Sequence, residues 1–298
     1  RSLHVLRTFR LRTRSQRVRR TPVVTDAVDY YLDDRLRRNV PELLLTRVFV
    51  PPALQRAVAA QFLLLYELSE LTVIRETGVA MTKMTWWFEE WKRLREGAPR
   101  HPVTKSLLAD AALLGLSTSA SAEDSNQNFV WPKLDGPLSV VAAILQGQTP
   151  ADRSELQQWL ADFAAPLAAL EPQQESTTAG ELPTGAWQNV VLLGWVAKLP
   201  KLSELGRAPW PLDLTAQTQL RRAQLKEQEH QSAAARHLWQ HGGGEEGVGP
   251  SGGGHAGIYL AVAERTVLAR ATGQREAGRW RQLMTAWRAK RRSLKPGD

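Results

Sequence analysis

Two consecutive stretches with helical spacing of apolar residues constrain this chain's fold most strongly. The first follows Pro51 and Pro52, whose fixed φ and missing N–H suit the start of a helix. In it, apolar side chains recur every three or four residues, at Leu54, Val58, Phe62, Leu65 and Leu68. The second stretch has the same pattern and stops at Gly97, Ala98 and Pro99; its apolar positions are Met81, Met84, Trp87, Trp91 and Leu94. Because no segment of any length alternates apolar and polar residues, the sequence predicts an all-α protein.

The same spacing predicts helices elsewhere in the chain. Helices are expected over residues 105–116, 137–146, 187–199 and 215–241, with a further one opening at Asp152 and one or two more over 258–292. Pro200 is expected to end the helix over 187–199, because proline lacks the N–H that a helix interior needs. The polar segments between these helices read as surface loops.

The composition limits the broad class of protein. At 298 residues the chain can bury a substantial core, and most of its 11 tryptophans are expected there. Cysteine is absent, which excludes disulfides and thiolate metal sites. The sequence has no run of about 20 apolar residues, which argues against a membrane span.

Positive charge is concentrated at the two ends of the chain. Residues 1–20 carry eight arginines and no acid, and residues 279–295 carry seven Lys or Arg and no acid. Between them, residues 21–278 hold 24 basic and 29 acidic side chains, a net charge of about −5. The overall charge of +9 therefore comes from basic ends on a mildly acidic body.

The amino-terminal arm has the Arg-rich, Ser/Thr-containing and acid-free composition of a mitochondrial targeting segment, so we expect location in the mitochondrial matrix. The chain begins with Arg1 and not with methionine, so we also expect an earlier cleavage. An ordered arm would need an anionic neighbour, because its arginines repel one another. That neighbour is either RNA phosphate or an acidic protein groove. The residues expected to make these contacts are Arg7, Arg10, Arg12, Arg14, Arg17, Arg19 and Arg20, with Arg288, Lys290, Arg291 and Arg292 in the basic tail.

The order of short motifs resembles the squalene/phytoene synthase family. An R-A-V-x-A start at Arg56, a Y-E-L segment at Tyr66, a helix with Met84 before two tryptophans, and H-P-V from His101 follow one another. Residues 206–214 (GRAPWPLDL) resemble the family's G-R-x-Y-L-P-x-D-L signature. The resemblance covers roughly residues 25–290 and is greatest to the family's mitochondrial branch, the respiratory complex I assembly factors. It implies a single-domain, isoprenoid-synthase-like helical bundle.

In active members of that family, two Asp-rich motifs on facing helices hold Mg²⁺, which binds the diphosphate of prenyl substrates. At the first motif position this chain has Glu67 and Glu70, carboxylates that do not match the family's aspartates or their spacing. These glutamates could be Mg²⁺ ligands. The alternative is an ordinary helix face on which Arg75 and Lys83 balance them.

The second motif position departs further from the family's pattern. It falls at about residues 189–202, beginning at Asn189, and has Ala197 and Lys198 where the family has Arg-Asp. Lys198 would put a cation where Mg²⁺ should sit, and like charges at close range repel. The resemblance and this departure together predict a pseudoenzyme with no catalytic residues, no metal and no cofactor.

The functional prediction is a non-catalytic scaffold or assembly factor within a large mitochondrial complex. We divide the chain into an Arg-rich arm (1–21), a helical domain (22–278) with a Gly-rich flexible loop (242–254), and a basic tail (279–298). The arm favours the mitochondrial ribosome and its RNA as host, whereas the family branch favours respiratory complex I assembly. A different class of function, residual prenyl-lipid binding or prenyltransferase activity in a helical cavity, remains the alternative.

Overall fold

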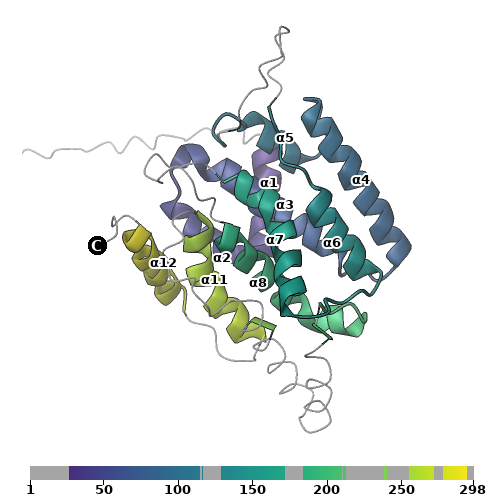
Figure 1. The fold of residues 1–298 in the computed structure, drawn as a ribbon. Helices are drawn as coiled ribbons and strands as arrows, with labels where there is room; N and C mark the ends of the chain where they lie inside the picture. Colours follow the sequence, from purple (N-terminus) through teal and green to yellow (C-terminus); the bar gives the residue numbers. More distant parts are fainter. Residues whose placement is uncertain are drawn as a thin grey trace, which may run out of the picture.

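The structure, a computed structural model, describes residues 27–114, 116, 129–171, 184–209, 211–212, 238–239, 255–271 and 278–293. These residues form a helical bundle without β-strands, which confirms the all-α prediction (Figure 1). The isoprenoid-synthase-like topology stays a prediction. No helix in the described part of the chain is both long and apolar enough to cross a bilayer. The helices are α1 (Ala27–Asn39), α2 (Pro41–Thr46), η1 (Arg47–Phe49), η2 (Pro52–Leu54), α3 (Gln55–Leu71), α4 (Thr77–Arg95), α5 (Pro102–Ala109), α6 (Asp135–Leu145), α7 (Arg153–Ala169), α8 (Thr184–Glu204), α11 (His255–Ala271) and α12 (Arg279–Ser293).

Helix α3 lies at the centre of the bundle. Its residues from Ala57 to Leu65 are all buried, as expected for a helix surrounded by others. It packs against α1, α4, α5, α6 and α8. Phe62 contacts the rings of Trp187 on α8 and Tyr259 on α11, with centroids 4.9 and 4.6 Å apart. The helix predicted after the two prolines is therefore the core element of the fold.

Helix α4 forms the edge of the bundle away from α11 and α12 (Figure 1). Its inner face carries Trp87 and Trp91, which are buried in the same cluster as Val58 and Phe62 of α3. The two predicted faces therefore share one core, as predicted. The helix ends as the sequence predicted, because Gly97 adopts a positive φ of 74°. There the Ala98 N–H donates to the Arg93 carbonyl at 2.8 Å.

The largest errors in the predicted helix bounds fall on α5 and α8. Helix α5 begins at Pro102, before the predicted start at residue 105, because the His101 side chain caps its first turn. It ends at Ala109, before the predicted end at residue 116. Helix α8 continues through Pro200 to Glu204. The missing N–H of Pro200 leaves the Val196 carbonyl without its usual helical partner, yet the helix does not end there. Burial of Leu199 and Leu202 on either side holds the helix together.

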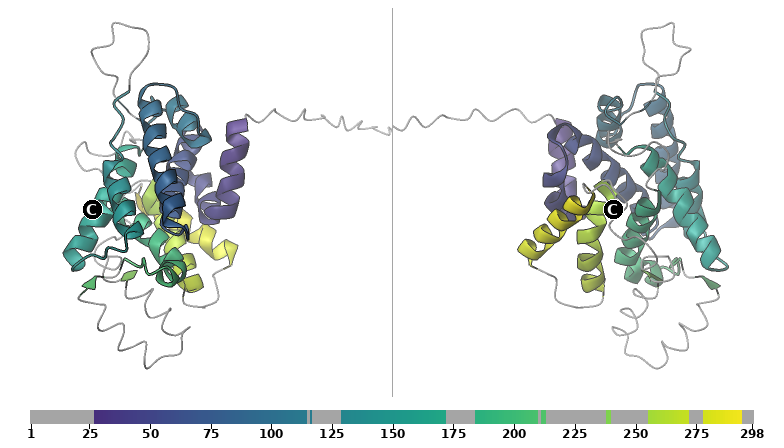
Figure 2. Two further views of the ribbon diagram at one scale, coloured as in Figure 1. Left: turned by 90° about the vertical axis from the view of Figure 1, so that its right-hand side faces the viewer. Right: turned by 60° about the vertical axis from the view of Figure 1, so that its left-hand side comes forward.

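Helices α11 and α12 close the other side of the bundle and lie beside each other in Figure 2. Ile258 and Val262 of α11 pack with Ala286 of α12 in a small second cluster. The predicted basic tail thus includes a helix that contacts α11 and α2. The predicted arm (1–21), Gly-rich loop (242–254) and most of the helix over 215–241 lie outside the described residues.

Candidate functional site

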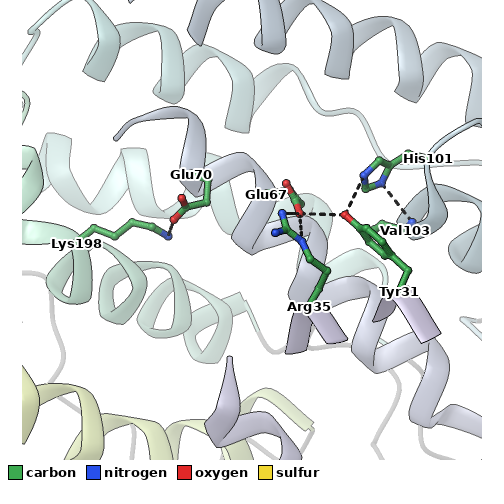
Figure 3. A network of polar contacts seen from close by, with 7 residues as sticks. All are labelled: Tyr31, Arg35, Glu67, Glu70, His101, Val103 and Lys198. Atoms are coloured by element: carbon green, nitrogen blue, oxygen red, sulfur yellow. Dashed lines mark hydrogen bonds and ion pairs between the residues drawn. The ribbon is translucent and has the colours of Figure 1, made fainter. Parts of the chain in front are cut away.

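Glu67, at the first family-motif position, is held by a cation from α1. The guanidinium of Arg35 donates to Glu67 Oε1 from Nε at 3.1 Å and from Nη2 at 2.5 Å (Figure 3). Arg35 also lies over the rings of Tyr31 and Tyr66, 5.8 and 5.9 Å from their centroids. Both ring faces favour a cation at this place. The charge of Glu67 is therefore balanced by Arg35, beside the rings of Tyr31 and Tyr66.

Glu70 is held by a second cation, Lys198 from α8. Lys198 Nζ lies 3.1 Å from Glu70 Oε1 and 4.7 Å from the ring centroid of Tyr66. Its side chain is only 15% exposed. Burial lowers the pKa of Lys198, and the Glu70 carboxylate acts in the opposite direction. Burial likewise raises the pKa of Tyr66, with Glu70 adding to the rise.

The structure thus joins the two positions that the resemblance singled out through one ion pair, Glu70 with Lys198, whereas Glu67 pairs with Arg35, which lies at neither position. The sequence alternative in which Arg75 and Lys83 balance the glutamates was wrong, because other cations pair with them. Both of these residues are exposed, and the cations come instead from α1 and α8. Because α3 lies at the centre of the bundle, Glu67 and Glu70 lie against α1 and α8 and pair with residues far away in the sequence.

A hydrogen-bonded chain links Glu67 to the start of α5. The backbone N–H of Val103 donates to His101 Nδ1 at 3.3 Å, so the ring proton resides on Nε2. Nε2 lies 3.3 Å from the Tyr31 hydroxyl, which donates in turn to Glu67 Oε1 at 3.4 Å (Figure 3). This order of donors and acceptors requires neutral His101. It ties α1, α3 and α5 to one another.

Aromatic rings surround His101 and set its protonation. Trp87 and Trp86 meet the imidazole edge-on, with centroids 5.0 and 5.7 Å away. Burial lowers the pKa of His101, Glu67 and Glu90 act to raise it, and Arg35 acts to lower it. The lowered pKa of His101 agrees with the neutral imidazole that the hydrogen bonds require.

A buried carboxylate, Glu90 on α4, fixes the backbone that carries His101. Its Oε1 accepts from the N–H groups of Arg100 and His101 at 2.7 and 2.8 Å, and from the Thr104 hydroxyl at 2.5 Å. Its Oε2 accepts from Arg93 Nε at 2.9 Å. Burial acts to raise the pKa of Glu90, but these hydrogen bonds outweigh it and the pKa is lowered. Sequence reasoning missed Glu90, because a glutamate between tryptophan and glutamate on a helix reads as a surface residue.

The remaining motif positions do not join the network. Asn189 is buried on α8, but it is nine residues before Lys198 and therefore half a helical turn out of phase with it. Ala197 is exposed.

The predicted binding arginines fall largely outside the described side chains. Arg288 is exposed on α12. Lys290, Arg291 and Arg292 belong to the same helix, although their side chains are outside the description. The seven arginines named in the arm lie outside the described residues, so their contacts stay a prediction.

Chemically, the arrangement is a set of satisfied ion pairs and hydrogen bonds that join helices. Among the described residues, no three His, Cys, Asp or Glu side chains gather in a way that could hold a metal ion. Comparison of the chain with known proteins gave no matching family model, no matching curated protein and no matching solved structure.

Proposed function

We propose that this protein is a non-catalytic helical scaffold of the squalene/phytoene synthase type that works within a large mitochondrial complex. The observation that supports this most is the pair of internal ion pairs, Arg35 with Glu67 and Lys198 with Glu70. At the positions where the family resemblance implies metal ligands, each carboxylate already has a cation of its own chain.

Conversion of this site to one that holds Mg²⁺ would be costly. Mg²⁺ takes oxygen ligands, so both glutamates would have to leave their partners. Lys198 would then remain in a place that is only 15% exposed without a counter-ion. Removing the counter-ion of a largely buried cation is destabilising, and because Glu70 is itself 34% exposed the loss is smaller than for a fully buried pair. The polar network therefore suits a role in holding α1, α3 and α8 together, not in binding a diphosphate.

A direct test is to incubate the purified full chain with prenyl diphosphates and Mg²⁺ and to follow product and diphosphate release. We expect no turnover from the wild type and none from Glu67→Ala, with exposed Glu89→Ala as the matched control. Turnover by the wild type that Glu67→Ala abolishes and Glu89→Ala preserves would instead establish residual prenyltransferase activity.

For the host complex we propose the mitochondrial ribosome, with assembly of respiratory complex I as the second candidate. The first rests on the eight arginines of residues 1–20, and the second on the branch of the family that the motifs resemble. Sedimentation of a tagged chain in mitochondrial lysate distinguishes them. We expect it to migrate with a ribosomal subunit and to shift on RNase treatment. Migration with complex I intermediates, insensitive to RNase, would favour the second host, and migration as a free monomer would contradict both.

A further inference from the structure

Helix α12 has an unusual composition for an element that packs on a bundle. Its sequence, RWRQLMTAWRAKRRS, contains six Arg or Lys residues and no acid. It lies at the outer edge of the molecule beside α11 (Figure 2). Its described inner side chains include one apolar and one polar contact with the bundle. Ala286 is buried, and Gln282 Nε2 donates to Thr266 Oγ1 of α11 at 3.2 Å.

The outer face of α12 combines cations with apolar side chains. Arg281 and Arg288 are exposed, and half-buried Met284 lies between them in helical register. Trp287 stands beside this stripe with 41% of its surface exposed. The neighbouring η1, which contacts α12, exposes Val48. The packing of α12 on the bundle therefore leaves an outward surface that is both basic and apolar.

We propose that this outer face of α12 binds the surface of a membrane that contains anionic phospholipids, with the helix lying parallel to the bilayer. Arginines would contact the headgroup phosphates, and Met284 and Trp287 would enter the boundary between headgroups and acyl chains. Tryptophan is well suited to that boundary, because its large amphipathic ring favours the level of the headgroups. The proposal does not depend on the scaffold function above.

The mixture of side chains favours a lipid surface over RNA or a protein groove. RNA phosphates would engage Arg281 and Arg288 but offer Met284 no apolar partner. A helix-binding groove takes up apolar anchors over two turns, whereas the side chains described on this face place Met284 and Trp287 between two arginines. At a bilayer surface the charged headgroups lie above the hydrocarbon, so neighbouring arginine and apolar side chains can each reach a suitable partner.

The experiment uses the absence of cysteine from the chain. Met284→Cys in the full chain gives a single thiol on α12, which is labelled with a polarity-sensitive fluorophore. Phe88→Cys, on an exposed part of α4, gives the matched control. The labelled proteins are titrated with vesicles of phosphatidylcholine alone and with vesicles that also contain phosphatidylglycerol. We expect a blue shift and a rise in intensity at position 284 only with the anionic vesicles, and little change at position 88.

The basic arm also attracts anionic vesicles, so vesicle binding by itself is not the readout. Vesicles that sediment the chain without changing the signal at position 284 would overturn the proposal, because the arm would then be the contact. A signal at position 284 that responds to single-stranded RNA but not to anionic vesicles would also overturn it, in favour of RNA. An equal response to neutral and anionic vesicles would contradict the proposed role of the arginines.

A charge variant measures that role. In the labelled Met284→Cys background, Arg281→Gln with Arg288→Gln should weaken the vesicle affinity read at position 284 roughly ten- to thirtyfold. The matched control, Arg37→Gln with Arg95→Gln, removes two exposed arginines from α1 and α4 and should change it by less than about threefold. Equal losses from both pairs would mean that total charge, and not the face of α12, determines binding.

Discussion

His101 illustrates how one side chain can couple three helices through its protonation state. Its Nδ1 caps α5, and its Nε2 reaches the Tyr31 hydroxyl of α1, which bonds Glu67 of α3. Protonation of the ring would remove the acceptor that Val103 uses. The region around Glu67 therefore depends on a neutral imidazole.

This dependence predicts a pH effect on stability. The pKa of His101 in the folded chain is below its ordinary value of 6.5, so the unfolded chain binds the proton more readily. The stabilising contribution is complete above pH 6.5 and is lost as the pH falls below it. The free energy of unfolding should decrease there by at most about 1.4 kcal/mol per pH unit from this residue. Urea denaturation at a series of pH values should show this decrease in the wild type and a flatter profile in His101→Gln; parallel profiles would contradict it.

Trp87 makes the simplest test of the packing between α3 and α4. It is 4% exposed and contacts the His101 ring, whereas its neighbour Phe88 is 49% exposed. Truncation of Trp87 to alanine should lower the free energy of unfolding by about 3–5 kcal/mol. Phe88→Ala should cost less than about 1 kcal/mol by the same denaturant titration. Similar losses in the two variants would mean that the inner face of α4 is misassigned.

At this scale the sequence predicted burial better than pairing. The three- and four-residue spacing was enough to place Trp87 and Trp91 inside, because periodicity reports which side of a helix faces the core. The partners of Glu67 and Glu70 could not be read in the same way. Arg35 is 32 residues from Glu67, and nothing in local spacing indicates a contact between them. Motif comparison did single out Lys198, but as an obstacle to a metal and not as the partner of Glu70.

Between elements, a buried arginine connects the end of α8 to the turn that joins α3 and α4. Arg207 is 6% exposed, and its Nη1 donates to the carbonyls of Thr72 and Ile74 at 3.3 and 2.5 Å. Its Nη2 donates to the Arg75 carbonyl at 3.3 Å and to the Thr77 hydroxyl at 2.7 Å. Carbonyls at the end of one helix and the hydroxyl at the start of the next thus share one guanidinium. Gly206, with φ 65°, turns the chain so that Arg207 can reach them.

Loss of this arginine should loosen the turn. Arg207→Met removes four hydrogen bonds and should lower the free energy of unfolding by about 1–3 kcal/mol. Hydrogen exchange should speed up in the last turn of α3 and the first turn of α4. Exposed Arg95→Met, at the far end of α4, should stay within about 0.5 kcal/mol of the wild type. Unchanged exchange at residues 72–77 in Arg207→Met would rule out the connecting role.

Element boundaries were harder to predict than the elements. The helix over 187–199 was found from its apolar residues, but the rule that proline ends a helix failed at Pro200. Local preference disfavours proline there, and burial of Leu199 and Leu202 overrides it. Such an override depends on what the helix packs against, which local sequence does not contain.

For the molecule as a whole, the most informative prediction concerns the basic arm and its partner. If the arm binds ribosomal RNA, each arginine–phosphate contact releases counterions. The logarithm of affinity should then fall with the logarithm of salt concentration, with a slope of roughly −0.7 to −0.9 per contact. Binding of the full chain to isolated mitochondrial ribosomal subunits, measured across salt concentrations, gives that slope. Substitution of Arg10, Arg12 and Arg14 by glutamine should make it shallower by about 2–3 units. A slope that the three substitutions leave unchanged would favour the acidic protein groove instead.

Lys198 and Glu70 also limit the routes by which this sequence can change. Replacing Lys198 alone by an acid would set two carboxylates against each other, and replacing Glu70 alone would strand an ammonium that is 15% exposed. Either single replacement should give a less stable protein, whereas exchanging both residues together keeps the charges balanced. Substitutions here should therefore be tolerated in pairs and rejected one at a time. A chain with this pair cannot gain a second carboxylate beside Glu70 by the single change Lys198→Glu without losing part of its stability.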